Sequence, residues 1–147
     1  MGGHGALSIG LKHPDLYRSV SAFSPITNPM NCPWGIKAFS LYLGEDKANW
    51  PRYDSCELLK AADSVPPILV DQGSADSFLE EQLKPDMFQC ISKQHDHIVS
   101  RMQDGYDNRY FFIQSFIEDH LAFHARYLKY CSKKNKKTNT ITGFHLF

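Results

Sequence analysis

The stretch ILVDQGSAD (residues 68–76) carries the clearest fold signal in this chain. Three consecutive branched apolar residues follow Pro66-Pro67, a pattern typical of a short strand that is buried on both faces, as in a parallel sheet. We expect the strand to end in the polar run Asp71-Gln72-Gly73, so that a loop carrying Asp76 lies at its carboxyl end.

Two further strand-like segments flank this one along the chain. Residues 19–23 (SVSAF) alternate in polarity and end before a Ser-Pro pair, and residues 97–102 lead into an Asp-Gly turn. Helical patterns separate the strands, over residues 2–12, 36–43, from Asp54 as an N-cap, from Pro85 to about 91 and over 109–130. The alternation predicts an α/β fold of about three parallel strands with flanking helices, joined by right-handed crossovers.

Composition limits the classes of protein that remain. A chain of 147 residues with 42% hydrophobic content suits one domain with a core of its own. Sixteen basic and sixteen acidic residues cancel, which argues against a nucleic acid or an anionic membrane as partner. Neither a membrane span nor a signal peptide is recognisable, so we expect a cytoplasmic protein. The four cysteines form no metal-binding or disulfide pattern, which favours a reducing compartment: Cys32, Cys56, Cys90 and Cys131.

The last segment differs in character from the rest of the chain. Residues 131–147 (CSKKNKKTNTITGFHLF) are polar, lysine-rich and without periodicity. We therefore expect a single domain over residues 1–130 and a disordered lysine-rich tail over 131–147. The lysine run resembles a short localisation patch, but a solvated tail is the commoner meaning of such a run.

Ligand chemistry in open α/β sheets gathers at the carboxyl ends of the strands, which here means the loops 24–34, 73–78 and 105–108. Asp76 is a candidate triad acid, or alternatively a cap of the helix that follows. Trp34 lies in the first of these loops and is either the wall of a substrate pocket or a core tryptophan. The role of His4 stays undecided.

A metal site is the weaker interpretation of two other histidines. His120 and His124 have the i, i+4 spacing of helical zinc ligands, but Leu121 stands where a zinc protease has glutamate. We therefore expect a polar helix face there and no metal.

Three longer stretches carry a family resemblance: SAFSPITNPMNCPWGIKAFSLYLG, VDQGSADSFLEEQLKPDMF and DGYDNRYFFIQSFIEDHLAFHARYL. They resemble the C-terminal half of the S-formylglutathione hydrolase (esterase D) family, from residue 1 to about Tyr130. The resemblance implies a fragment of an α/β-hydrolase fold and a cofactor-free serine esterase. It also implies the family's reaction, in which the thioester S-formylglutathione is hydrolysed to glutathione and formate during formaldehyde detoxification.

The resemblance also assigns roles to individual residues. The family's nucleophile elbow reads Gly-His-Ser-Met-Gly-Gly-His-Gly-Ala, so the serine falls immediately before Met1, and Met1 takes the oxyanion-hole position. Asp76 matches the triad acid. The triad histidine belongs to Gly-Tyr-Asp-His-Ser-Tyr, and the corresponding residue here is Asn108.

An amide cannot accept a proton near neutral pH, so we expect the chain as given to be inactive. Three interpretations stay open. The chain is a fragment of the enzyme, a catalytically dead paralogue that acts as a binding or dimerising module such as a homodimer, or an incomplete gene product whose true start lies upstream of Met1.

Overall fold

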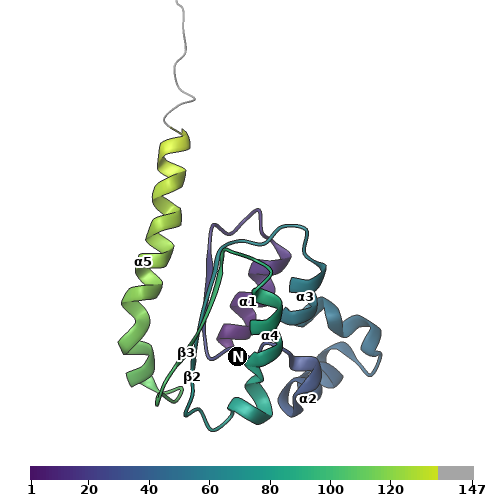
Figure 1. Cartoon of the computed structure of the whole chain (residues 1–147). Coiled ribbons are helices and arrows are strands. Elements are labelled where there is room, and N and C mark those ends of the chain that lie inside the picture. The colour runs from purple at the N-terminus through teal and green to yellow at the C-terminus, as the bar shows by residue number, and fades with distance from the viewer. Residues whose placement is uncertain (136–147) are drawn as a thin grey trace, which may run out of the picture.

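The computed structural model describes residues 1–135 and shows one three-stranded parallel sheet between two layers of helices (Figure 1). The strands pair in the order β1-β2-β3, with Val20 opposite Ile68 and Ile68 opposite Ile98. The α/β fold predicted from the sequence is confirmed. The strands and α-helices, in chain order, are α1 (Gly2–Lys12), β1 (Val20–Phe23), α2 (Pro33–Leu43), α3 (Ser55–Ala61), β2 (Ile68–Gly73), α4 (Pro85–Ser92), β3 (Ile98–Gln103) and α5 (Tyr110–Asn135).

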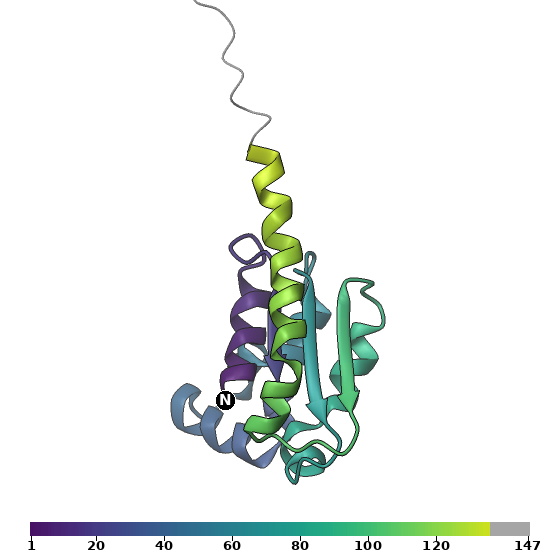
Figure 2. The same cartoon turned by 90° about the vertical axis from the view of Figure 1, so that its left-hand side faces the viewer.

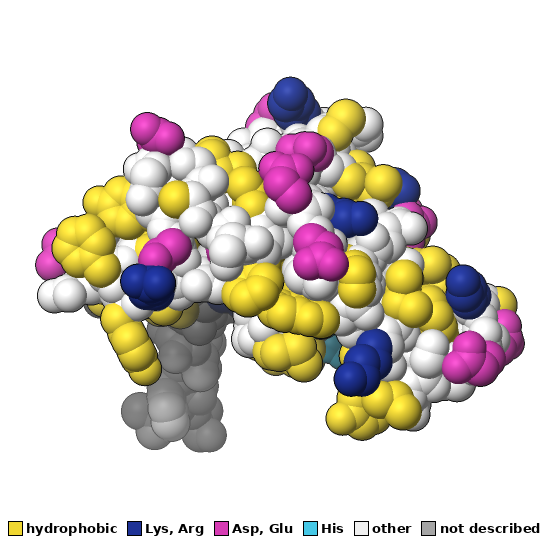
Figure 3. All heavy atoms as spheres, turned by 90° about the horizontal axis from the view of Figure 1, so that it is seen from below, with side chains coloured by type: hydrophobic (Ala, Val, Ile, Leu, Met, Phe, Trp, Pro, Cys, Tyr) yellow, Lys and Arg dark blue, Asp and Glu magenta, His cyan; other side chains and the backbone are white. Residues whose placement is uncertain are grey.

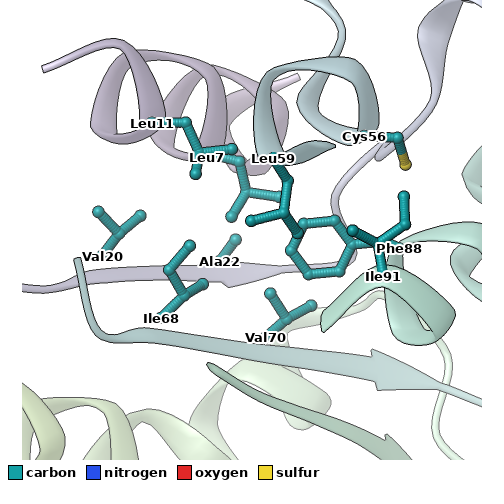
Figure 4. Packing of buried hydrophobic residues seen from close by; sticks show 10 residues of the cluster. All are labelled: Leu7, Leu11, Val20, Ala22, Cys56, Leu59, Ile68, Val70, Phe88 and Ile91. Atoms are coloured by element: carbon teal, nitrogen blue, oxygen red, sulfur yellow. The ribbon is translucent and has the colours of Figure 1, made fainter. Parts of the chain in front are cut away.

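The main hydrophobic core lies between the sheet and helices α1, α3 and α4 (Figure 4). Alternate residues of β1 and β2 point into it, so each strand contributes apolar side chains at every second position. Gly10 lets α1 lie close to the sheet, because a Cβ there would stand 2.3 Å from a methyl group of Val20. Ten residues form this core: Leu7, Leu11, Val20, Ala22, Cys56, Leu59, Ile68, Val70, Phe88 and Ile91.

Helix α5 covers the opposite face of the sheet and continues past the end of the strands (Figure 2). Its Phe112 and His120 pack against Phe23 of β1, with the His120 and Phe23 rings stacked 3.8 Å apart. The helix ends at Asn135, five residues beyond the predicted boundary at 130. The rest of the predicted tail, residues 136–147, lies outside the described residues.

Two local signals explain how helices begin. Asp54 caps α3 as predicted, since its Oδ1 accepts the N–H groups of Cys56 and Glu57 at 2.9 and 3.2 Å. Helix α2 begins at Pro33, three residues earlier than predicted. The Sγ of Cys32 accepts the N–H of Gly35 at 3.4 Å, and proline suits the first helical position.

Short 3₁₀ and π turns fill the connections that the sequence left irregular. They span Pro29–Asn31, Lys47–Tyr53 and Leu79–Leu83. Strand β2 runs to Gly73, at the end of the polar run Asp71-Gln72-Gly73 in which it was predicted to end. The carboxylate of Asp71 in this run lies inside the protein, where side chains of β3 and α5 bind it.

Candidate functional site

The strands all point toward one end of the molecule, and the three predicted loops meet there. Seen from that end, hydrophobic side chains gather around a recess in the surface (Figure 3). Helix α1 starts at the same end, and a Cβ on its Gly3 would lie 2.8 Å from the carbonyl oxygen of Phe23. The beginning of α1 is thereby fixed against the carboxyl end of β1.

Asp76 lies in the loop after β2 and is buried, with 5% of its surface exposed. Its Oδ1 accepts the backbone N–H of Phe78 at 2.9 Å, and its Oδ2 accepts the side-chain amide of Gln72 at 3.5 Å. The first bond lies within the loop, because the N-cap of the following turn, Leu79–Leu83, is Phe78, which makes no side-chain cap bond; the alternative interpretation of Asp76 as that cap is wrong. The carboxylate thus has a fixed orientation, which is what a triad acid requires.

The loop after β3 packs directly on the loop that carries Asp76. The N–H of Ala75 donates to the carbonyl of Tyr106 at 2.9 Å, and a Cβ on Gly73 would lie 2.2 Å from the same oxygen. Asn108 follows in this loop and is exposed, between Asp107 and Arg109, which form an ion pair of 3.1 Å. The structure therefore brings the loops of Asp76 and Asn108 into contact.

Met1 and Trp34 line a second part of the site, an apolar groove of about 300 Å³ between the start of α1 and helix α2. His4 lies in the same groove, and its Nδ1 is 3.2 Å from the carbonyl oxygen of Ile26. Burial lowers the pKa of the His4 imidazole below its usual range, so the ring is neutral near pH 7. Because Nδ1 of this neutral imidazole bonds to the backbone, Nε2 is the ring nitrogen that can bind a ligand.

Trp34 connects the groove to the Asp76 loop. Its ring lies 4.7 Å from that of Phe78, centroid to centroid, and its backbone N–H donates to Oε1 of Gln82 at 3.0 Å. With 47% of its surface exposed, Trp34 is not a core residue, so that interpretation is wrong. Both parts of the site thus belong to one surface, linked by the Trp34–Phe78 contact.

A buried ionic cluster centred on Asp71 was not foreseen from the sequence. Asp71 is fully buried and accepts bonds from Arg101 and Gln103 of β3 and from His120 Nε2 of α5, the last at 3.0 Å. Burial is the largest single influence and opposes ionisation. The donors outweigh it, so that the pKa of Asp71 falls to about 2. A carboxylate directly after an apolar strand was the signal for this cluster, but its partners are 30 and more residues away.

The two histidines of α5 face the sheet and not solvent, so the predicted polar helix face is wrong. His120 is 2% exposed and bound to Asp71. His124 lies within hydrogen-bond distance of the hydroxyls of Ser19 and Ser21, at 2.7 and 2.9 Å. Over residues 1–135, no group of three or more ligand side chains is placed to hold a metal ion.

In the part of the chain that the structure describes, no helix has the length and apolar content needed to cross a membrane.

Three parallel strands with helices on both faces form an α/β fold, and its superposition on a solved S-formylglutathione hydrolase, given below, assigns it to the class of α/β-hydrolases. The chain belongs to the esterase family, since the Esterase family model matches residues 1–123. It is similar to S-formylglutathione hydrolase from Arabidopsis thaliana, with 50% identity over 131 residues. That match covers 88% of this chain and 46% of the plant protein.

Solved structures give the same result. S-formylglutathione hydrolase from Agrobacterium tumefaciens superposes with a TM-score of 0.81 at 47% identity, covering 86% of this chain and 46% of that protein. The S-formylglutathione hydrolase FrmB from Staphylococcus aureus shares the fold, with a TM-score of 0.64 at 18% identity, covering 84% of this chain and 51% of that protein. The chain therefore spans about half the length of the relatives that it matches.

Proposed function

We propose that this chain forms the acid-bearing half of an S-formylglutathione hydrolase, an esterase that cleaves the thioester S-formylglutathione to glutathione and formate and so serves formaldehyde detoxification. Asp76 is the triad acid, Asn108 occupies the position of the base, and the N–H of Met1 serves the oxyanion hole. The observation that carries the proposal is the buried, oriented Asp76 carboxylate, on a loop whose backbone contacts the Asn108 loop.

The groove beside Met1 supplies a place for the substrate. Its lining is almost entirely apolar, and Trp34 and Tyr53 stand at it as aromatic walls. Such a surface binds the carbon chain or the sulfur of a thioester better than a charged group. The glutathione carboxylates then point to solvent outside the groove.

Asn108 determines how much activity this half can support. Hydrolysis by a serine requires a base that takes the hydroxyl proton, and an amide cannot do so. We infer that the 147-residue chain alone does not hydrolyse the thioester, and that an esterase completed with it is slow for want of the base.

The exposed Asn108 also favours a second candidate function, a catalytically dead paralogue that acts as a binding module. In that case the groove still binds a thioester or thiol, but restoring a histidine brings no turnover. The two functions differ in this one outcome.

The cysteines support a reducing compartment such as the cytoplasm. Cys32, Cys56 and Cys90 are free thiols. Burial, with the neighbouring Asp54 carboxylate, raises the pKa of the Cys56 thiol to about 12, so that thiol stays protonated and unreactive. None of these three cysteines forms a disulfide, whereas small secreted proteins commonly depend on disulfides for their stability.

The test uses a hybrid enzyme in which the N-terminal part of the Arabidopsis protein, which precedes the matched region, is joined to residues 1–147. Hydrolysis of S-formylglutathione is measured for the hybrid with Asn108→His. We expect turnover, and we expect Asp76→Asn in the same hybrid to lower kcat by a factor on the order of 10⁴, as for loss of a triad acid.

The matched control is Asp86→Asn, which removes an acidic residue from the exposed start of α4 and should leave kcat unchanged. A hybrid carrying Asn108→His that binds the thioester but never turns it over would support the dead paralogue. Equal activity with and without Asp76→Asn would refute Asp76 as the acid.

A further inference from the structure

We propose that Nε2 of His4 accepts a hydrogen bond from an amide N–H on the thiol side of the substrate, so that the site selects thioesters of N-acylated cysteine over plain alkyl thioesters. The inference rests on the proposed function for the place of the reacting carbonyl, at the N–H of Met1. The acceptor itself follows from the geometry of the apolar groove.

The hydrogen bond of His4 determines which ring nitrogen carries the proton. Nδ1 lies 3.2 Å from the carbonyl oxygen of Ile26, and a carbonyl oxygen can only accept, so Nδ1 is the donor. Because burial lowers the pKa of the imidazole, the ring is neutral near pH 7 and has no second N–H. Nε2 therefore presents a lone pair and acts as an acceptor.

The surroundings of His4 offer Nε2 no donor. In the part of the chain that the structure describes, Ile26 is the residue that forms a hydrogen bond with this ring. Apolar side chains line the groove around it, among them Phe39, whose ring centroid lies 6.4 Å from that of His4. An acceptor that is half-buried among apolar groups is poorly solvated, so a ligand that brings a donor to it is favoured.

The other polar side chains of the groove lie nearer to solvent. Trp34, Tyr42 and Tyr53 also line it, and all three are exposed, so water reaches their polar atoms. The indole of Trp34 is a donor only and cannot replace an acceptor. His4 is thus the neutral imidazole acceptor of the groove, and a matching ligand combines an apolar body with an N–H donor.

The position of His4 on α1 determines which part of the substrate meets it. Met1 is the N-cap of α1, and His4 lies three residues further on the same side of the helix, ~4.5 Å along its axis. The formyl group of S-formylglutathione carries no N–H. On the thiol side, the cysteinyl α-carbon next to the sulfur-bearing carbon carries an amide N–H, which is the donor closest to the thioester.

The test measures the binding of S-methylglutathione, a thioether that cannot be hydrolysed, to the hybrid enzyme that keeps Asn108, by isothermal titration calorimetry. His4→Leu should weaken binding about three- to tenfold, the effect of one neutral hydrogen bond. His4→Gln, whose Oε1 can accept, should lose less. His13→Leu is the matched control, because it makes the same substitution at the exposed C-cap of α1, and it should leave the affinity unchanged.

A second ligand separates recognition by His4 from a structural role. S-methylglutathione that is methylated on the cysteinyl amide nitrogen has no N–H to donate there. We expect the unchanged hybrid to bind this ligand about three- to tenfold more weakly than S-methylglutathione, and His4→Leu to cause no further loss. If His4 only supported the fold, His4→Leu would weaken the binding of both ligands by the same factor.

The proposal is overturned if His4→Leu binds S-methylglutathione as tightly as the unchanged hybrid, or if it weakens both ligands equally. It is also overturned if His4→Gln loses as much affinity as His4→Leu, or if the unchanged hybrid binds neither ligand. A hybrid with Asn108→His that shows no turnover bears only on the proposed catalytic function, because both ligands bind without reaction.

Discussion

At the scale of single residues, Asp71 joins the two layers of the molecule. Its carboxylate is fully buried and holds Arg101 of the neighbouring strand and His120 of α5. Removal of one member of a buried ionic group leaves the others without a partner. We predict that Asp71→Asn lowers the free energy of unfolding by about 3 kcal/mol, measured by urea denaturation.

The control for this variant is Asp119→Asn. Asp119 binds the same Arg101 at 2.8 Å but is 55% exposed, so its loss should cost less than about 1 kcal/mol. Equal losses for both variants would mean that burial of Asp71 has no energetic importance.

The depressed pKa of Asp71 also makes stability depend on pH. An aspartate in the unfolded chain titrates near 3.9, whereas Asp71 in the fold titrates at about 2. The carboxylate therefore contributes stability above about pH 4, which is lost as the pH falls toward 2. We predict that the loss of unfolding free energy between pH 5 and pH 2 is about 2 kcal/mol smaller in Asp71→Asn than in the unchanged chain. An identical pH dependence in the two proteins would contradict this.

At the scale of elements, Gly73 sets the distance between the loops of Asp76 and Asn108. A Cβ there would lie 2.2 Å from the carbonyl oxygen of Tyr106, which is backbone and cannot turn aside. We predict that Gly73→Ala separates the loops and lowers the free energy of unfolding by about 2 kcal/mol, measured by thermal unfolding. In the hybrid enzyme with Asn108→His, the same change should lower kcat/KM.

Helix α1 offers the matched control. Gly5 has no atoms within 4 Å of the position of a Cβ, so Gly5→Ala should stabilise the helix by about 0.5–1 kcal/mol. If Gly73→Ala were as harmless as Gly5→Ala, the contact between the two loops would not be rigid.

The elements also show where sequence patterns suffice and where they fail. The three strands and the five α-helices were predicted because their signals are local, such as the apolar run 68–70, the Asp54 cap and the apolar face of α5. The buried cluster around Asp71 was missed because the partners of this carboxylate come from β3 and α5, far along the chain. The burial of His120 on α5 was missed because its partner, Asp71, lies on β2, 49 residues earlier in the chain. The roles of Asp76 and Asn108 were assigned by family resemblance and stay predictions.

At the scale of the whole molecule, an open edge and exposed apolar side chains determine how the chain behaves alone. Ile9 and Tyr17, beside β1, are 49% and 43% exposed, and Leu121 on α5 is 61% exposed. Unpaired edges and apolar patches favour irregular association. We predict that the chain alone forms mixed, concentration-dependent aggregates, measured by dynamic light scattering, and that the N-terminal part of the relative suppresses them. A stable monomer with a sharp melting transition would contradict this.

The hybrid enzyme joins the three scales, because the acid, the contact between the loops and the completed sheet must all be in place for turnover. The central claim is that this half of an esterase holds an oriented acid and lacks the base. Its most direct test is the ratio of kcat/KM for S-formylglutathione between the hybrid with Asn108→His and the hybrid with Asn108. We predict a ratio of about 10²–10⁴, the gain typical of general acid–base catalysis, and no gain for Asn108→Gln. A ratio near one, with both hybrids active, would contradict the account and would point to another base such as His4.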